Sequence, residues 1–96
     1  MTDPIRLLLA ADQQMVRAGF RLVLDAQPDM TVVGEANTGA EAVTLVDELS
    51  PDVVLMDIRM PILDGLGATE KIMAAHTEAR ILVLTTFDLD EYVHAA

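Results

Sequence analysis

Short apolar runs alternate along the chain with stretches in which apolar residues recur every three or four positions. The short runs predict four strands, at residues 5–10, 30–36, 53–57 and 81–85. The helical spacing predicts helices at residues 14–26, 38–49 and 66–75, with a further helical pattern at 91–96. Thr38 and Glu41 have the spacing of a capping box, which marks where the second helix begins.

Strands and helices that alternate in this way predict an α/β fold, a doubly wound parallel sheet with helices on both faces. In the strand order 2-1-3-4, the direction of winding reverses between the first and third strands, where such sheets place their ligand crevice. The third run is apolar on both faces and ends at Asp57, so it suits a central strand. Asp12 follows the first strand and Thr85 ends the fourth, and we expect both to meet Asp57 at one crevice.

Asp12 and Asp57 would repel each other unless a cation bridged them. Oxygen ligands with water in the remaining positions suit Mg²⁺, which commonly binds one or two carboxylates together with phosphate oxygens. A carboxylate can also attack phosphorus to give an aspartyl phosphate, and a hydroxyl such as that of Thr85 could donate to the phosphoryl oxygens. The pattern therefore favours a Mg²⁺-dependent phosphoryl acceptor.

Composition narrows the class of protein. The 96 residues allow one domain, and their 52% apolar content is too high for a disordered chain. The net charge of −10 argues against direct nucleic-acid binding by this segment. The chain contains no cysteine, which excludes disulfides and thiolate metal sites, and its apolar runs are too short to span a membrane. A cytoplasmic location is expected.

The chain resembles the receiver domain of two-component response regulators, in the LuxR/NarL branch that normally carries a helix-turn-helix DNA-binding domain. This resemblance implies a flavodoxin-like, CheY-like fold. The segments that carry it span nearly the whole chain: IRLLLA at 5–10, DQ at 12–13, VRAGF at 16–20, VGEA at 33–36, PDVVLMDIRMP at 51–61, DG at 64–65 and LTTFD at 84–88.

The resemblance also implies roles for individual residues. Asp57 would accept the phosphoryl group from a sensor histidine kinase, and Asp12 and the backbone carbonyl of Arg59 would help to hold Mg²⁺. Thr85 would be the switch hydroxyl. The domain would be a switch rather than an enzyme, limited to phosphorylating itself from a donor and to autodephosphorylation, and it would regulate transcription through a DNA-binding domain absent from this sequence.

The sequence departs from the family in two ways. The acidic pair that follows the first strand in the family is here Ala11-Asp12, so we expect weakened Mg²⁺ binding. The family continues for about one more strand and helix, which supply a lysine to the site, whereas the only lysine here, Lys71, lies on the third predicted helix. Residues 1–96 are therefore interpreted as a truncated receiver domain. Its fourth strand would leave an apolar edge, for which we expect a homodimer or a swapped or edge-paired oligomer.

Several alternatives stay open. The chain could be a degenerate receiver that works as a phosphorylation-independent interaction or dimerisation module. Asp12 could be a helix N-cap, Thr85 an ordinary strand residue, and Asp64-Gly65 turn chemistry. The side chains of Met56, Met60 and Met73 are predicted to fill the core. A haloacid-dehalogenase-type phosphatase is rejected because Arg59 stands where it needs an acid, and a flavodoxin because the first loop lacks hydroxyl groups.

Overall fold

The computed structural model describes residues 3–58, 60, 63–75 and 80–84. Within them the elements follow the predicted alternation: β1 (Ile5–Ala10), α1 (Gln14–Asp25), β2 (Met30–Ala36), α2 (Gly39–Leu49), β3 (Val53–Asp57), α3 (Gly65–Ala75) and β4 (Arg80–Leu84). All paired strands are parallel and lie in the order β2-β1-β3-β4, which confirms the predicted sheet. The helix predicted at 91–96 lies outside the described residues.

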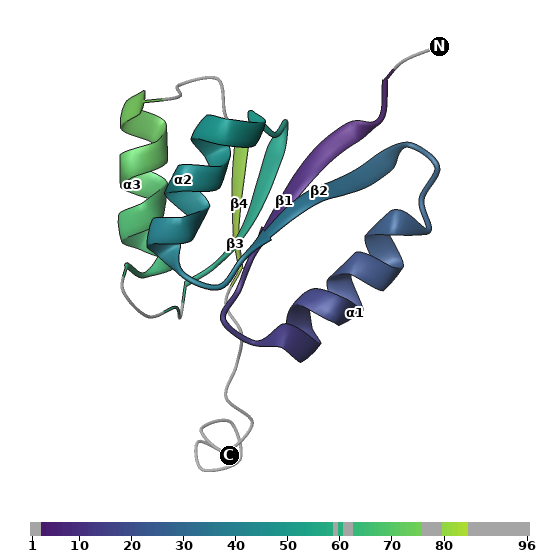
Figure 1. Cartoon of the computed structure of the whole chain (residues 1–96), viewed down its shortest axis with the longest axis horizontal. Helices are drawn as coiled ribbons and strands as arrows, with labels where there is room; N and C mark the ends of the chain where they lie inside the picture. Colours follow the sequence, from purple (N-terminus) through teal and green to yellow (C-terminus); the bar gives the residue numbers. More distant parts are fainter. Residues whose placement is uncertain (1–2, 59, 61–62, 76–79, 85–96) are drawn as a thin grey trace.

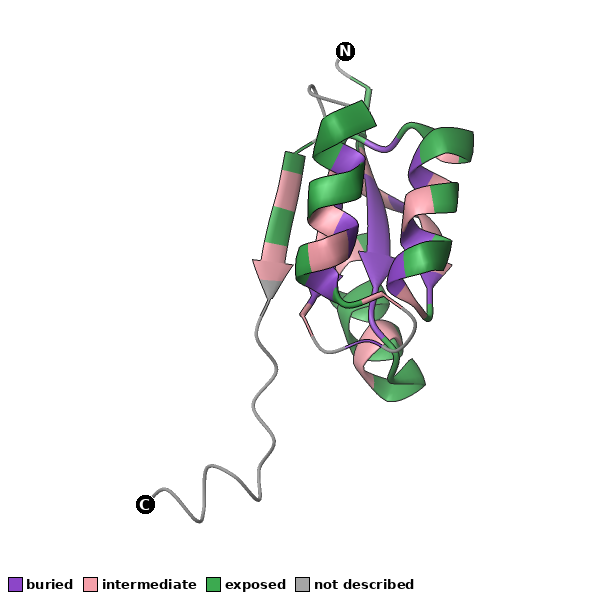
Figure 2. Ribbon diagram, turned by 90° about the vertical axis from the view of Figure 1, so that its left-hand side faces the viewer, coloured by how far each residue is buried: buried purple, intermediate pink, exposed green. Residues whose placement is uncertain are grey.

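The helices divide between the two faces of the sheet, with α2 and α3 on one face and α1 on the other (Figure 1). Because successive strand residues point to opposite faces, Leu8 and Ala10 join the larger apolar cluster beneath α2 and α3. Leu7 and Leu9 join a smaller cluster on the α1 side. Figure 2 shows the buried residues gathered between the sheet and the pair α2 and α3. The core therefore lies mainly on that face.

The methionine predictions are partly confirmed. Met56 and Met60 are buried in the larger cluster. Met73 is exposed, so the prediction that it fills the core is wrong. The physical reason is helical geometry: Ile72, the preceding residue, takes the inward position on α3, and adjacent residues on a helix do not share a face.

Helix α1 packs less deeply than its apolar spacing suggests. None of its residues is buried, and the side chains of Met15, Leu22 and Val23 are well exposed, with Met15 at 87% of its full surface. Within the described residues, α1 contacts only β1 and β2, so one flank of the helix has no apolar neighbour there. The amphipathic pattern correctly predicted the helix, but it could not show how much of the helix would be covered.

The helix ends follow the expected chemistry. The hydroxyl of Thr38 accepts a hydrogen bond from the Glu41 backbone N–H at 3.0 Å, which confirms this part of the capping box. Ser50 ends α2 in the left-handed conformation, with φ of 46°. The carboxylate of Asp64 accepts from the Gly67 N–H at 2.8 Å, so it caps α3.

The ladder between β1 and β2 slips by one residue. Leu7 is paired with Val32, but the next residue, Leu8, is paired with Gly34, so Val33 is an extra residue in β2. Such a bulge reverses the faces to which the following residues point. Glu35, paired with Leu9, consequently lies on the α1 side of the sheet.

Candidate functional site at the carboxyl ends of the strands

Asp57 is the last residue of β3, which lies between β1 and β4. Its side chain is only 4% exposed, and it is the one buried polar or charged side chain among the described residues. A buried carboxylate is costly unless hydrogen bonds or opposite charge stabilise it. The sequence prediction that Asp57 ends a central strand is confirmed, and its carboxylate is buried at the carboxyl end of that strand.

The neighbouring strand brings the turn between β1 and α1 to the same end of the sheet. Ala10 is paired with Met56, so Ala11 follows at the level of Asp57, and these two residues line one small pocket. Asp12 comes next and is exposed. It is not the N-cap of α1, because that position belongs to Gln13, which makes no capping hydrogen bond through its side chain.

Helix α3 begins directly against the end of β3. The backbone N–H of Gly65 donates to the carbonyl of Ile58 at 2.9 Å. A Cβ atom at position 65 would lie 2.2 Å from the carbonyl oxygen of Asp57, so a side chain has no room there. The pair Asp64-Gly65 is thus a helix cap followed by a close backbone contact. Sequence reasoning attributed it only to turn chemistry and missed the role of Gly65 beside Asp57.

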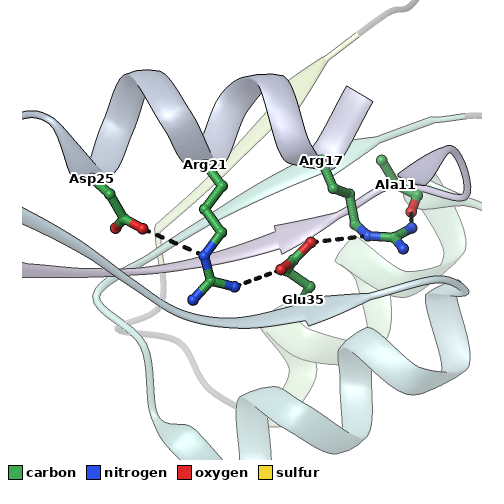
Figure 3. Close-up of polar contacts among 5 residues, drawn as sticks. All are labelled: Ala11, Arg17, Arg21, Asp25 and Glu35. Atoms are coloured by element: carbon green, nitrogen blue, oxygen red, sulfur yellow. Dashed lines mark hydrogen bonds and ion pairs between the residues drawn. The ribbon is translucent and has the colours of Figure 1, made fainter. Parts of the chain in front are cut away.

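Arg17 is a second residue that the sequence prediction missed. It lines the same pocket as Asp57, and its guanidinium donates to the backbone carbonyl of Ala11 (Figure 3). The available signal was its spacing, because Arg17 lies three and seven positions before the apolar residues Phe20 and Leu24 on the predicted helix. Two other predicted site residues, Thr85 and Arg59, lie outside the described residues, so their roles stay predictions.

The donor set suits a hydrated Mg²⁺ ion. Asp57 ends β3 and Asp12 lies in the turn after the neighbouring strand β1, so two carboxylates follow adjacent strands, and Mg²⁺ usually keeps several waters beside one or two carboxylates. No group of three or more acidic, histidine or cysteine side chains suited to a metal occurs in the described part of the chain. The residues thus fit a water-rich site and not a closed protein cage. None of the described helices is long and apolar enough to cross a membrane.

A doubly wound parallel sheet in the order β2-β1-β3-β4 is typical of the flavodoxin-like class of α/β domains. Within this class, the chain belongs to the response regulator receiver domain family, whose model matches residues 7–96.

Relatives and solved structures agree with this assignment. The chain is 50% identical over 91 residues to the transcriptional regulatory protein YxjL of Bacillus subtilis, covering 95% of this chain and 42% of YxjL. It is 49% identical over 90 residues to the transcriptional regulatory protein LiaR of the same organism, covering 94% of this chain and 43% of LiaR. A LuxR-family two-component response regulator from Aurantimonas superposes with a TM-score of 0.83 at 34% identity, over 96% of this chain and 66% of that one. The chain spans less than half the length of these curated relatives.

Proposed function

We propose that this chain is the phosphoacceptor domain of a two-component response regulator, and that Asp57 takes a phosphoryl group from a sensor histidine kinase. The observation that carries the proposal is the nearly buried Asp57 carboxylate at the carboxyl end of β3, beside the turn that contains Asp12. In the transfer, an Asp57 oxygen bonds to phosphorus while the bond from phosphorus to the donor imidazole nitrogen breaks, and that imidazole then takes up a proton. Receiver domains are regulatory switches, which agrees with a domain that stores a signal.

Asp12 and Asp57, with the backbone carbonyl of Arg59, are the residues proposed to hold Mg²⁺. The ion would neutralise charge on the phosphoryl oxygens, where the hydroxyl of Thr85 is proposed to donate a hydrogen bond. Ala11 leaves the site with one carboxylate fewer than its family normally has. We therefore expect weaker Mg²⁺ binding than a second acid at this position would give.

The output is proposed to be transcription regulation by a DNA-binding domain in the part of the protein that this chain does not span. The relatives carry the name of transcriptional regulatory proteins, and the chain covers about 42% of their length. With sixteen acidic and six basic residues, this segment would repel a phosphate backbone and is not expected to bind DNA itself. The protein is proposed to act in the cytoplasm.

The test uses the 96-residue chain with Mg²⁺ and acetyl phosphate, followed by intact-mass spectrometry and peptide mapping. We expect the mass of one phosphoryl group on Asp57, dependent on Mg²⁺ and absent in Asp57→Asn. A matched control is Asp47→Asn, which removes an exposed carboxylate from α2. Equal modification of the wild-type chain and Asp57→Asn would contradict the proposal.

A second candidate is a degenerate receiver that acts as a phosphorylation-independent interaction module. Ala11 favours it, because the residue occupies the pocket beside Asp57 with no carboxylate to offer a cation. Lys71, the only lysine in the sequence, lies on α3 and is exposed. Modification that appears only after Ala11→Asp would favour this candidate over the first.

The partners proposed for the chain include a second copy of itself. Among the described strands β4 is paired only with β3, and its Leu82 side chain is 55% exposed. An apolar edge strand is a template for pairing with another chain, so an edge-paired or swapped dimer is proposed. Light scattering at increasing concentration should show a dimer that Leu82→Lys weakens, and a strictly monomeric mass at high micromolar concentration would contradict it.

A further inference from the structure

A network of charged side chains joins α1 to β2 on the face of the sheet opposite α2 and α3 (Figure 3). Arg17 Nε donates to Glu35 Oε1 at 3.1 Å, and Arg21 Nη1 donates to Glu35 Oε2. Arg21 also forms an ion pair with Asp25 at 3.4 Å. Glu35 can accept from both arginines because the extra residue in β2 turns it toward α1.

The two arginines differ in burial and in what they contact. The side chain of Arg17 is 11% exposed, whereas that of Arg21 is 47% exposed. Exposed ion pairs contribute little to stability, while a nearly buried guanidinium needs its partners. The hydrogen bond with Glu35 raises the pKa of Arg21 above its ordinary value. Only Arg17 also reaches the turn after β1, through the carbonyl of Ala11.

Ala11 is held at both of its backbone groups. Its N–H donates to the carbonyl of Ala36 at 3.0 Å, and its carbonyl accepts from Arg17. The peptide group is planar, so the carbonyl of residue 11 and the Cα atom of residue 12 lie in one plane. A guanidinium that fixes the carbonyl therefore fixes where Asp12 leaves the strand.

The geometry points to Arg17 as a positioning residue for the cation site. This inference rests on the proposed function, in which Asp12 helps to hold Mg²⁺. Glu35 orients the guanidinium of Arg17, the guanidinium holds the Ala11 carbonyl, and that peptide group aims Asp12 toward the end of β3. In this role Arg17 would contact neither the cation nor the phosphoryl group.

Electrostatics and positioning predict opposite results when Arg17 is replaced. Removal of a positive charge near an acidic site favours a bound cation, so charge alone would make Arg17→Gln bind Mg²⁺ more tightly. Loss of an outer contact that orients a ligand typically weakens metal binding by about 10–100-fold. The direction of the change therefore separates the two effects.

The experiment measures Mg²⁺ affinity by isothermal titration calorimetry for the wild-type chain, Arg17→Gln and Arg21→Gln, at a temperature where circular dichroism shows each to be folded. We expect Arg17→Gln to bind about tenfold more weakly. Arg21→Gln removes the same charge from α1 but leaves the Ala11 contact, and it should match the wild type. At saturating Mg²⁺, the rate of modification by acetyl phosphate should recover in Arg17→Gln.

Hydrogen exchange supplies a readout that needs neither metal nor phosphate. Amides in residues 11–14 should exchange faster in Arg17→Gln than in Arg21→Gln, because only the first loses the bond to the turn. If Arg17→Gln does not fold, Arg17→Lys keeps the charge and the aliphatic stem but lacks the forked donors, and it should show part of both effects.

Unchanged exchange at these residues, or equal loss of Mg²⁺ affinity in the Arg17 and Arg21 variants, would overturn the inference. Failure of the wild-type chain to bind Mg²⁺ would instead count against the proposed function. The exchange comparison would still decide whether Arg17 holds the turn.

Discussion

The contact between Gly65 and the end of β3 gives the sharpest prediction about the site. Gly65 has no positive φ, so its backbone conformation does not require glycine. Glycine is required at this position because a side chain has no room. In Gly65→Ala the new Cβ would lie 2.2 Å from the Asp57 carbonyl oxygen and 2.8 Å from Ile58 Cα. Carbon and oxygen atoms in contact are normally about 3.3–3.6 Å apart. Backbone must therefore move by about 1 Å.

The cost follows from which atoms are in the way. Overpacking a well-packed site costs about 1–3 kcal/mol, and we expect the upper end because backbone atoms cannot rotate aside. Alanine would regain at most about 1 kcal/mol over glycine, the value for a helix interior, because Gly65 is the first residue of α3. The net loss is about 2 kcal/mol, which corresponds to a fall of about 10 °C in Tm for a chain of this size.

The assay is thermal unfolding followed by circular dichroism, with Gly19→Ala as the matched control. A Cβ atom at Gly19 meets nothing within 4 Å, so the same substitution in α1 should raise the stability by about 0.5–1 kcal/mol. The two variants should therefore shift Tm in opposite directions. A Tm for Gly65→Ala equal to or above that of the wild type would refute the close contact and, with it, the way α3 is docked beside Asp57.

Three further variants test the helix ends and the core by denaturant unfolding. Thr38→Ala removes the side-chain acceptor at the start of α2 and should lower the free energy of unfolding by about 1 kcal/mol; no change would mean that the cap is not formed in solution. Ser50→Gly places glycine, which tolerates a positive φ, in the left-handed conformation and should raise the free energy of unfolding by about 0.5–1 kcal/mol. A fall in the free energy of unfolding would contradict the φ assigned to Ser50. Ile72→Ala leaves a cavity where a side chain that is 1% exposed packs in the core, and it should lower the free energy of unfolding by about 2–5 kcal/mol. A smaller loss would mean that α3 packs less tightly than described.

The wound sheet was predictable from sequence because hydrophobic period and chain connectivity both pointed to it. The run ending at Asp57 is apolar on both faces, which only a covered central strand allows. The first and last residues of β1 and β2 were predicted correctly, because residues typical of turns flank both strands. The placement of Asp57 followed from the same pattern.

The missed features depend on contacts that no local pattern encodes. Periodicity places Met15 and Val23 on one side of a helix but cannot show whether another element covers that side. The need for glycine at position 65 arises from a carbonyl in a different element. Arg17 likewise acquires its role only because Glu35 and the Ala11 carbonyl come within reach.

The extra residue in β2 has a consequence for comparing this chain with its relatives. It changes the phase of the strand's two-residue repeat between Val32 and Gly34, and so decides which side of the molecule receives Glu35. A relative that lacks this residue would have to carry its acid one position earlier to meet an arginine on α1. Deleting Val33 here would remove the bulge and leave Glu35 opposite Leu9, so the carboxylate should still face α1. A one-residue alignment gap at this point thus marks the loss of the bulge, while the aligned residues after it keep the side of the sheet on which they lie.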